Sequence, residues 1–539
     1  MSRERAFALL GDKSAWTLPA IVRRQAQRYG ERPFLSFASG AALSFAGFDR
    51  ECDTLARALA ATGLARGDRV LAMLRNRAEL LLLAIACGRI GAIFVPVNTE
   101  MKGYSLQHQL HNCAPALVFV EADLTGAFAA VAAPAKLPTA VVVVDAAPAE
   151  EIAAFAGVRH WRYGEFAALQ GGQALADPSP QEIACIMYTS GTTGPAKGVL
   201  MPHAHLALFA VPSAGLELGE DDVYYVAMPL FHANALFIQV FGSLLCGARV
   251  HCVERFSPNR WLAEVRACGA TVTNLLGAMS EMVFKTPELP DDKDNPLRAI
   301  LAVPVADWVG RFCERFGVHV CQGFGMTECN MIAYATKDDP CLPGCAGTVR
   351  GDLFDVAIVD PETDEPVAEG EVGEIVVRPK IANAFMHGYF GMPEKTVEAW
   401  RNLWFHTGDA GRREGSLLYF VDRIKDRIRR RGENVSAFEV EQAINALAGV
   451  GESAVIGVRV GDAAAEQEVM ACVVRADGAA LTERQVLDHC LARVPRFAVP
   501  RFIQFVAELP KTVSGKVQKQ ALRERGAAAA WDRESGATK

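Results

Sequence analysis

Residues 68–97 read DRVLAMLRNRAELLLLAIACGRIGAIFVPV, and the order of their apolar segments predicts the fold class. A short apolar run, RVLAML, ends at a turn with Arg75 and Asn76. A longer segment, AELLLLAIACGRIG, then leads to a third run, AIFVPV. This order is typical of strand, helix and strand in a parallel α/β unit. Because the short runs lack polar alternation, we expect strands that are buried on both faces of a sheet.

The same pattern recurs outward from this stretch. YSLQHQLHNC is followed by PALVFVE and TAVVVV, and ATVTNLL and HVCQGFG come later in the chain. We therefore predict the α/β class. The length of 539 residues favours three or four structural units, since a unit usually has about 150 residues.

The character of the sequence changes after Val421, where the basic stretch DRIKDRIRRRGEN begins. It is followed by a helix candidate (SAFEVEQAINAL), two strand candidates (SAVIGVRV and VMACVVRA), a second helix candidate (TERQVLDHCLARV) and a last strand (FIQFVAELP). These segments predict a small α+β unit. We place the domains at residues 1–422 and 423–525, and we expect residues 526–539 to be a frayed tail.

Composition and charge exclude several classes of protein. Apolar residues make up 51% and charged residues 22% of the chain, which is ordinary globular usage and disfavours disordered, collagenous and coiled-coil proteins. The net charge of −7 gives no support for binding of nucleic acid or of an anionic membrane. The longest apolar run, residues 80–87, is far shorter than the ~20 residues of a membrane span, and the first residues make no secretory signal. We expect a cytoplasmic protein without an integral membrane segment.

The 14 cysteines are scattered and form no CxxC pair or close Cys/His cluster of the kind that binds a tetrahedral metal. The nearest pair, Cys341 and Cys345, has no further partners at metal-ligand spacing. We therefore expect free thiols in a reducing compartment.

A segment with phosphate chemistry follows the apolar run IACIMY. It reads TSGTTGPAKG and contains Thr189, Ser190, Gly191, Thr192, Thr193, Gly194 and Lys197. Glycines let backbone N–H groups approach a phosphate, hydroxyls add donors, and a lysine adds a positive charge. The segment is not a Walker A loop, because Ala196 stands where GxxxxGK requires glycine. The alternative is a flexible loop of small polar residues.

The longer string YTSGTTGPAKGVLMPH resembles the signature of the adenylate-forming superfamily, which includes acyl-CoA synthetases, nonribosomal peptide adenylation domains and beetle luciferases. The resemblance extends over nearly the whole chain, and the other motifs occur in the order of the family. It implies a large N-terminal α/β region with several sheets and a small C-terminal α+β domain on a hinge.

Residues 323–328 read GFGMTE and resemble the YGMTE element of the superfamily, with Phe324 in place of tyrosine. The resemblance implies that Phe324 lies against adenine beside Gly325, that Thr327 contacts phosphate, and that Glu328 helps to bind magnesium. These roles suit the residues, because a π-face accepts a purine and a hard cation prefers carboxylate oxygen. Without the family context, GFGMTE also fits a glycine turn before a helix.

Three further motifs resemble those of the superfamily. WFHTGDAG resembles the motif whose aspartate binds the ribose hydroxyls, and this implies that role for Asp409. The role suits a carboxylate, because it accepts hydrogen bonds and the two hydroxyls donate them. VDRIKDRIRRRGENVS resembles the hinge of the family and the loop after it. The resemblance implies that Arg423 contacts the nucleotide and that Lys425 is the hinge residue. It also implies that Gly432 and Glu433 lie near the approach of the thiol. The alternative for the basic stretch is a patch for RNA or lipid. PKTVSGKVQK resembles the motif that bears the catalytic lysine of the family, and the resemblance implies this role for Lys516.

The resemblance implies a two-step ligase. A carboxylate and ATP would give an acyl adenylate and diphosphate, and a thiol would then displace AMP. We expect ATP and Mg²⁺ as cofactors, coenzyme A as a second substrate, and a small-molecule carboxylic acid, of unspecified length and polarity, as the acid substrate. His232, in PLFHANA, is expected to gate and position the acyl carboxylate. The alternatives are a ligase that loads a carrier protein and a nucleotide-binding sensor without catalysis.

The chain also departs from the family pattern. Residues 301–308, LAVPVADW, lack the glycines of a GGAPL-like turn, and IRRRGENV is richer in arginine than is usual. The layout is closest to crotonobetaine/carnitine-CoA ligases and to steroid or bile-acid CoA ligases. Trp308 and Asp307 could serve a quaternary ammonium group, although local packing explains them equally well.

Overall fold

The computed structural model describes residues 3–129, 131, 138, 140–145, 155, 157–171, 177–189, 195–276, 278–303, 308–424, 428–430, 433–435, 437–459, 467–494, 498–512, 515–535 and 537–538. By its internal contacts the chain divides into two compact units. The first consists of Met1–Thr189, Pro195–Val356 and Val377–Phe405, and the second of Ser190–Gly194, Ala357–Val376 and His406–Lys539. Helices and strands alternate along the chain, and the predicted α/β class is confirmed.

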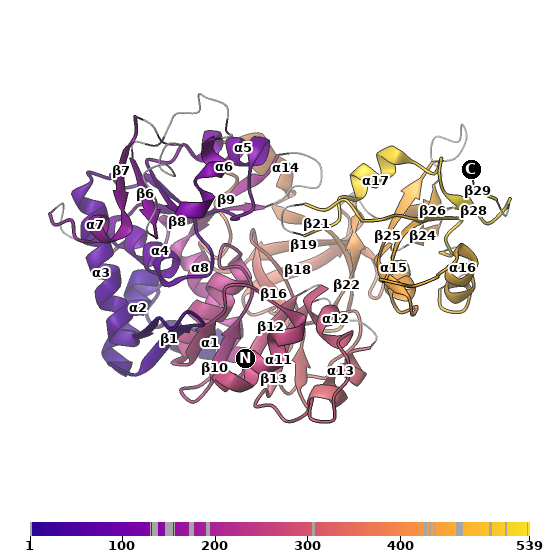
Figure 1. Ribbon diagram of the computed structural model, residues 1–539, viewed down its shortest axis with the longest axis horizontal. Helices are drawn as coiled ribbons and strands as arrows, with labels where there is room; N and C mark the ends of the chain where they lie inside the picture. The colour runs from indigo at the N-terminus through magenta and orange to yellow at the C-terminus, as the bar shows by residue number, and fades with distance from the viewer. Residues whose placement is uncertain are drawn as a thin grey trace. The chain divides into compact units, whose positions relative to one another are not determined.

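The first unit contains a seven-stranded sheet in which residues 68–97 form the predicted strand, helix and strand (Figure 1). The strand order is β7-β6-β5-β3-β4-β8-β9, and all neighbours are parallel except β8 and β9. The strands are β3 (Arg69–Met73), β4 (Ile93–Pro96), β5 (Leu117–Glu121), β6 (Ala140–Val144), β7 (Arg159–Arg162), β8 (Ile183–Thr189) and β9 (Lys197–Pro202).

Helix α4 (Ala78–Ile90), between β3 and β4, packs against α2 (Leu18–Tyr29) and α3 (Phe45–Ala61) (Figure 1). Its residues 80–89 are all buried. Arg89 is fully buried and forms ion pairs with Asp49 and with Asp53, the latter at 2.6 Å, so its charge is compensated. Over the described part of the chain, no helix has the length and apolar character needed to span a bilayer.

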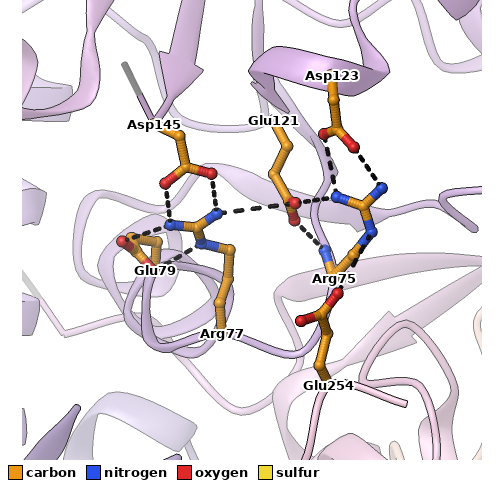
Figure 2. Close-up of polar contacts among 7 residues, drawn as sticks. All are labelled: Arg75, Arg77, Glu79, Glu121, Asp123, Asp145 and Glu254. Atoms are coloured by element: carbon orange, nitrogen blue, oxygen red, sulfur yellow. Dashed lines mark hydrogen bonds and ion pairs between the residues drawn. The ribbon is translucent and has the colours of Figure 1, made fainter. Parts of the chain in front are cut away.

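Charged side chains join the carboxyl ends of three neighbouring strands of this sheet, β3, β5 and β6 (Figure 2). Arg75 and Arg77 follow β3, and each bridges several carboxylates. Arg77 lies 2.8 Å from Asp145, and Arg75 lies 2.7 Å from Asp123. The carboxylate partners are Glu79, Glu121, Asp123, Asp145 and Glu254. We call these seven residues the arginine network.

The second sheet of the first unit has the strand order β14-β13-β12-β10-β11-β1-β2, in which only β1 and β2 are antiparallel. Its strands are β1 (Pro33–Phe37), β2 (Ala42–Ser44), β10 (Val223–Val226), β11 (Arg249–Cys252), β12 (Val272–Leu276), β13 (Ala299–Val303) and β14 (His319–Cys321). The segments ATVTNLL and HVCQGFG, predicted as strands, contain β12 and β14. Helices α11 (Pro258–Cys268), α12 (Ala278–Phe284) and α13 (Val309–Phe316) share a core with this sheet.

The remaining elements of the first unit are short. An antiparallel run comprises β15 (Gly323–Met326), β16 (Asn330–Tyr334) and β17 (Cys345–Val349). The helices are α1 (Arg3–Leu10), α5 (Gly103–Cys113), α6 (Gly126–Ala129), α7 (Tyr163–Ala167), α8 (His203–Ala210), α9 (Pro212–Gly215), α10 (Gly242–Cys246) and α14 (Pro393–Ala399), and a π-helix, η4, spans Asn234–Phe241. β20 (Trp400–Arg401) pairs with the first two residues of β21 (Trp404–Glu414).

The second unit has a five-stranded sheet in the order β25-β26-β27-β28-β29. This sheet and its helices give the predicted small α+β unit, with its own apolar cores. The elements are β25 (Val450–Val458), β26 (Glu468–Arg475), β27 (Phe502–Phe505), β28 (Trp531–Asp532), β29 (Ala537–Thr538), α15 (Ala437–Asn445), α16 (Glu483–Leu491) and α17 (Lys519–Arg525). Four strands that lie wholly or partly in this unit are β18 (Phe354–Val359), β19 (Gly373–Pro379), β21 (Trp404–Glu414) and β22 (Leu417–Arg423), and β23 (Ile428–Arg430) pairs with β24 (Glu433–Val435).

The frayed tail expected over residues 526–539 differs from the structure. Ala530 is fully buried in an apolar core, and the two residues of β28 pair with β27. Asp532 is 2% exposed and forms an ion pair of 3.1 Å with Arg501. Composition alone therefore misleads at this end, because one small apolar side chain and one carboxylate have partners elsewhere in the unit. The domain boundary at Asp422 stays a prediction.

Candidate active site

The phosphate segment connects two antiparallel strands. Thr189 is the last residue of β8, Lys197 is the first residue of β9, and the two lie opposite each other in the register. The intervening candidates lie outside the described residues: Ser190, Gly191, Thr192, Thr193 and Gly194. The structure thus brings together the hydroxyl and the lysine that flank the predicted phosphate loop.

The GFGMTE segment forms a tight hairpin rather than the start of a helix, because β15 pairs directly with β16. The register shifts between Phe324 and Gly325, and a side chain at Gly325 would overlap the carbonyl oxygen of Asn330. Phe324 is 7% exposed. Thr327 and Glu328 occupy the turn, so their positions are determined by the hairpin.

Glu328 and Thr189 meet beside a tyrosine that the sequence did not single out. The Glu328 side chain is buried, and its Oε1 lies 3.5 Å from the Thr189 hydroxyl and 3.2 Å from the Tyr389 hydroxyl. The Lys197 Nζ lies 4.6 Å from the centre of the Tyr389 ring, within the range of a cation–π interaction. Four side chains that suit a nucleoside triphosphate therefore converge within the first unit: Thr189, Lys197, Glu328 and Tyr389.

The side chain of His205, on α8, contacts the backbone of this hairpin. Its Nε2 lies 2.9 Å from the Thr327 carbonyl oxygen, and its Nδ1 faces the carbonyl of Ala384. Burial lowers the pKa of His205 to about 4, so the imidazole is neutral near pH 7 and donates one hydrogen bond. The Asn330 amide donates to the His205 carbonyl at 3.1 Å. No sequence signal marked His205, because its contacts are 122 and 179 residues away.

His232 lies on the turn that joins β10 to the π-helix η4. Its ring packs against Phe231 at 4.5 Å, and its carbonyl accepts a hydrogen bond from the Leu236 N–H at 3.0 Å. The Asn76 side chain holds the preceding residues, since its amide donates to the Met228 carbonyl and its oxygen accepts from the Leu230 N–H. π-Helical segments occur often at functional sites. The role of His232 stays a prediction.

In the second unit, Asp409 lies opposite Arg423 in the register of β21 and β22. The Asp409 side chain is 7% exposed, and its N–H donates to the Thr407 hydroxyl at 3.1 Å. Gly408 has a φ of 72°, a conformation that favours glycine. Its N–H donates to Glu374 at 3.0 Å, and the same carboxylate contacts His406 at 2.9 Å. The motif around Asp409 does not indicate Glu374, because Glu374 lies 32 residues before His406.

Lys516 is exposed on a turn of the second unit. The Thr512 N–H donates to the Lys516 carbonyl at 2.7 Å, and the Lys516 N–H donates to the Thr512 hydroxyl at 3.1 Å. Glu433 is in β24, and its side chain, like that of Arg423, lies outside the described part of the structure. Lys425, Gly432 and Asp307 lie outside the described residues.

Comparison with known proteins gives the family. Residues 22–390 match the family of AMP-binding enzymes, and residues 439–516 match the C-terminal domain of AMP-binding enzymes. The chain belongs to the AMP-binding enzyme family. The family and the enzyme class predicted from the motifs are confirmed.

Relatives of this AMP-binding enzyme cover nearly its full length. A crotonobetaine/carnitine–CoA ligase from Salmonella typhi is 30% identical over an alignment of 508 positions that covers 92% of this chain and 96% of the relative. The structure of ATP-bound MatB from Rhodopseudomonas palustris superposes with a TM-score of 0.80 at 28% identity, covering 94% of this chain and 98% of that one. An o-succinylbenzoate coenzyme A synthetase from Bacillus subtilis shares the fold, with a TM-score of 0.78 at 24% identity and coverage of 93% and 98%.

Proposed function

We propose that this AMP-binding enzyme is an ATP-dependent carboxylic acid:CoA ligase that works through an acyl adenylate. Its substrates are a carboxylic acid, ATP and CoA, and its products are acyl-CoA, AMP and diphosphate. The observation that carries the proposal is the convergence of the Thr189 hydroxyl, the Lys197 ammonium and the Glu328 carboxylate around Tyr389. The names of the relatives, which are CoA ligases and synthetases, support it.

In the first half-reaction the acid carboxylate attacks the α-phosphorus of ATP, and the bond to the bridging oxygen breaks to release diphosphate. We assign Lys197 and the hydroxyls of residues 189–193 to the phosphates, since donors and positive charge offset the charge of phosphate oxygens. Lys516 is the second cation and stabilises the charge that develops in the transition state.

The donor set near Glu328 suits magnesium. Carboxylate and hydroxyl oxygens are the hard ligands that this cation prefers, and Mg²⁺ commonly binds through one or two carboxylates together with substrate phosphates. Within the described residues, no group of three or more His, Cys, Asp and Glu could hold a metal ion. We therefore propose Glu328 as the protein ligand. A bound Mg²⁺ would supply positive charge beside the phosphate oxygens.

Five further residues are assigned to the nucleotide. We assign Phe324 and Gly325 to the adenine, Thr327 to the phosphate, and Asp409 with Arg423 to the ribose. The buried carboxylate of Asp409 is suited to two vicinal hydroxyl donors.

In the second half-reaction the CoA thiol attacks the acyl carbon, and AMP leaves. We assign Lys425 to the hinge, Gly432 and Glu433 to the thiol approach, and His232 to the gate beside the acyl group. The exposure of Lys516 on a short turn is consistent with a lysine that must enter for one half-reaction and withdraw for the other. We propose the cytoplasm as the location.

The test is diphosphate release from ATP and Mg²⁺ with a panel of acids, each with and without CoA. The panel runs from short and quaternary-ammonium acids through aryl and fatty acids to steroid side-chain acids. Acid-dependent release together with acyl-CoA, detected by mass spectrometry, is the expected result. Release without acyl-CoA would identify a carrier-protein acceptor instead, and silence across the panel would favour a nucleotide sensor.

A further inference from the structure

Tyr389 touches both charged groups of the site but has no part in the assignments above. Its hydroxyl lies 3.2 Å from Oε1 of Glu328, and the centre of its ring lies 4.6 Å from Nζ of Lys197. Glu328 and Lys197 are on different elements, at the β15–β16 turn and at the start of β9. Tyr389 is therefore a common partner for the proposed metal ligand and the phosphate-binding lysine.

The backbone around Tyr389 is fixed against β9. The His387 N–H donates to the Leu200 carbonyl at 2.8 Å, and the Leu200 N–H donates to the Gly388 carbonyl at 3.0 Å. The Phe390 N–H donates to the Gly198 carbonyl at 2.7 Å, so residues on both sides of Tyr389 pair with the strand that begins at Lys197. The tyrosine and the lysine are thus held in one register.

One further hydrogen bond holds the tyrosine itself. The Tyr389 N–H donates to the Thr396 hydroxyl at 2.9 Å. The segment also carries Gly388 at a φ of 125°, where a Cβ atom would approach Thr396 to 2.9 Å. The Tyr389 side chain is 6% exposed, so its position does not depend on solvent contacts.

The hydroxyl of Tyr389 is a hydrogen-bond donor at neutral pH. A phenol carries its proton at this pH, and the Tyr389 hydroxyl lies within hydrogen-bond distance of Oε1 of Glu328, at 3.2 Å. A hydrogen bond of this kind fixes the orientation of a metal-binding carboxylate, and loss of such a partner typically weakens metal binding ten- to a hundredfold.

We propose that Tyr389 is a positioning residue that orients Glu328 towards magnesium through its hydroxyl and Lys197 towards phosphate through its ring. This inference rests on the proposed function, because it assumes that the site binds magnesium and ATP. The two contacts predict separable effects: loss of the hydroxyl changes the dependence on magnesium, whereas loss of the ring changes the binding of ATP itself.

The experiment compares Tyr389→Phe and Tyr389→Leu with the unmodified chain. Equilibrium binding of ATP is measured by calorimetry in EDTA and across a magnesium titration. For Tyr389→Phe we expect the magnesium concentration for half-maximal effect to rise about tenfold, with ATP binding in EDTA unchanged within about twofold. For Tyr389→Leu we expect the same rise, together with a loss of ATP affinity in EDTA of about two- to fivefold.

Tyr188→Phe is the matched control. It removes a tyrosine hydroxyl from β8, next to Thr189, where the group donates to Asn112 at 2.7 Å and not to Glu328. We expect the magnesium dependence of this variant to match that of the unmodified chain. An unchanged magnesium dependence in Tyr389→Phe, or an equal change in Tyr188→Phe, would overturn the proposal.

Two further readouts separate this inference from its premise. The first is the binding of ATP and magnesium by the unmodified chain, and the second is its release of diphosphate with an acid. If the unmodified chain binds magnesium and ATP but activates no acid, the proposed function fails while the role of Tyr389 is still decided by the binding data. If Tyr389→Leu does not fold, Tyr389→Phe, which keeps the ring and its packing, decides the matter alone.

Discussion

The Glu328 carboxylate illustrates how much of this site depends on single contacts. One oxygen faces two hydroxyls, from Thr189 and Tyr389, that come from segments 139 and 61 residues away. The neighbouring backbone is held by His205. A side chain on a hairpin turn can rotate, because the backbone alone does not fix its orientation. The proposed roles of Thr327 and Glu328 therefore depend on these long-range contacts as much as on the motif.

The proposed role of Lys516 leads to a half-reaction test. Lys516→Ala should lower acid adenylation by about 10²–10³-fold, because charge that develops in the transition state loses its cation. Thioester formation from supplied acyl adenylate and CoA should be nearly unchanged. The measurement is diphosphate release for the first half-reaction and acyl-CoA formation for the second.

Lys511→Ala provides the control for this variant. Lys511 is on the same loop but pairs with Glu452 at 2.6 Å. Both half-reactions should proceed normally in it. An equal loss of both half-reactions in Lys516→Ala would disprove the assignment of Lys516 to adenylation.

At the scale of elements, the arginine network stabilises the carboxyl edge of the first sheet (Figure 2). Glu121 is 4% exposed and accepts from the N–H of Arg75 and from its guanidinium. Arg75→Ala removes the nearer cation from this buried carboxylate and leaves it with Arg77, whose Nη1 lies 3.8 Å away. We expect a loss of about 1–3 kcal/mol in the free energy of unfolding, measured by urea denaturation of the first unit.

A matched comparison uses Arg50→Ala, which removes the exposed pair between Arg50 and Glu31. We expect no measurable change there, because exposed pairs are screened by solvent. The Arg75→Ala effect should shrink when Glu121→Gln is added, since the buried charge that has lost its nearer cation is then gone. Equal losses in Arg50→Ala and Arg75→Ala would contradict the role of the arginine network.

Local patterns predicted the elements well and the site only in part. Apolar runs such as RVLAML specify strands because their burial is a local property, and β3, α4 and β4 follow from residues 68–97. The contact between Tyr389 and Lys197 joins residues far apart in sequence, and no spacing rule encodes it. The prediction of a frayed tail over residues 526–539 is wrong for the same reason. Asp532 pairs with Arg501, which lies just before β27 and outside the C-terminal segment.

At the scale of the whole molecule, buried histidines predict a stability that falls in mild acid. Burial lowers the pKa of His203 to about 3 and that of His205 to about 4, below the ordinary value of 6.5. The unfolded chain therefore binds more protons below pH 6.5. Stability should fall as the pH drops from 6.5 towards 4, by about 1.4 kcal/mol per pH unit for each histidine.

The measurement is urea denaturation at pH 7.5, 6 and 5. His203→Gln should flatten the dependence on pH, whereas His160→Gln, which replaces an exposed histidine, should leave it unchanged. If His203→Gln had the same slope as the unmodified chain, the acid sensitivity would have another origin.

In the proposed reaction the chain makes an acyl adenylate before CoA takes part. The most direct measurement is exchange of labelled diphosphate into ATP, with Mg²⁺ and an acid that supports the full reaction but without CoA. We predict exchange that requires the acid, because the first half-reaction is reversible and independent of the thiol. Exchange that occurs only when CoA is present, or no exchange with an acid that yields acyl-CoA, would rule out an acyl adenylate formed before CoA takes part.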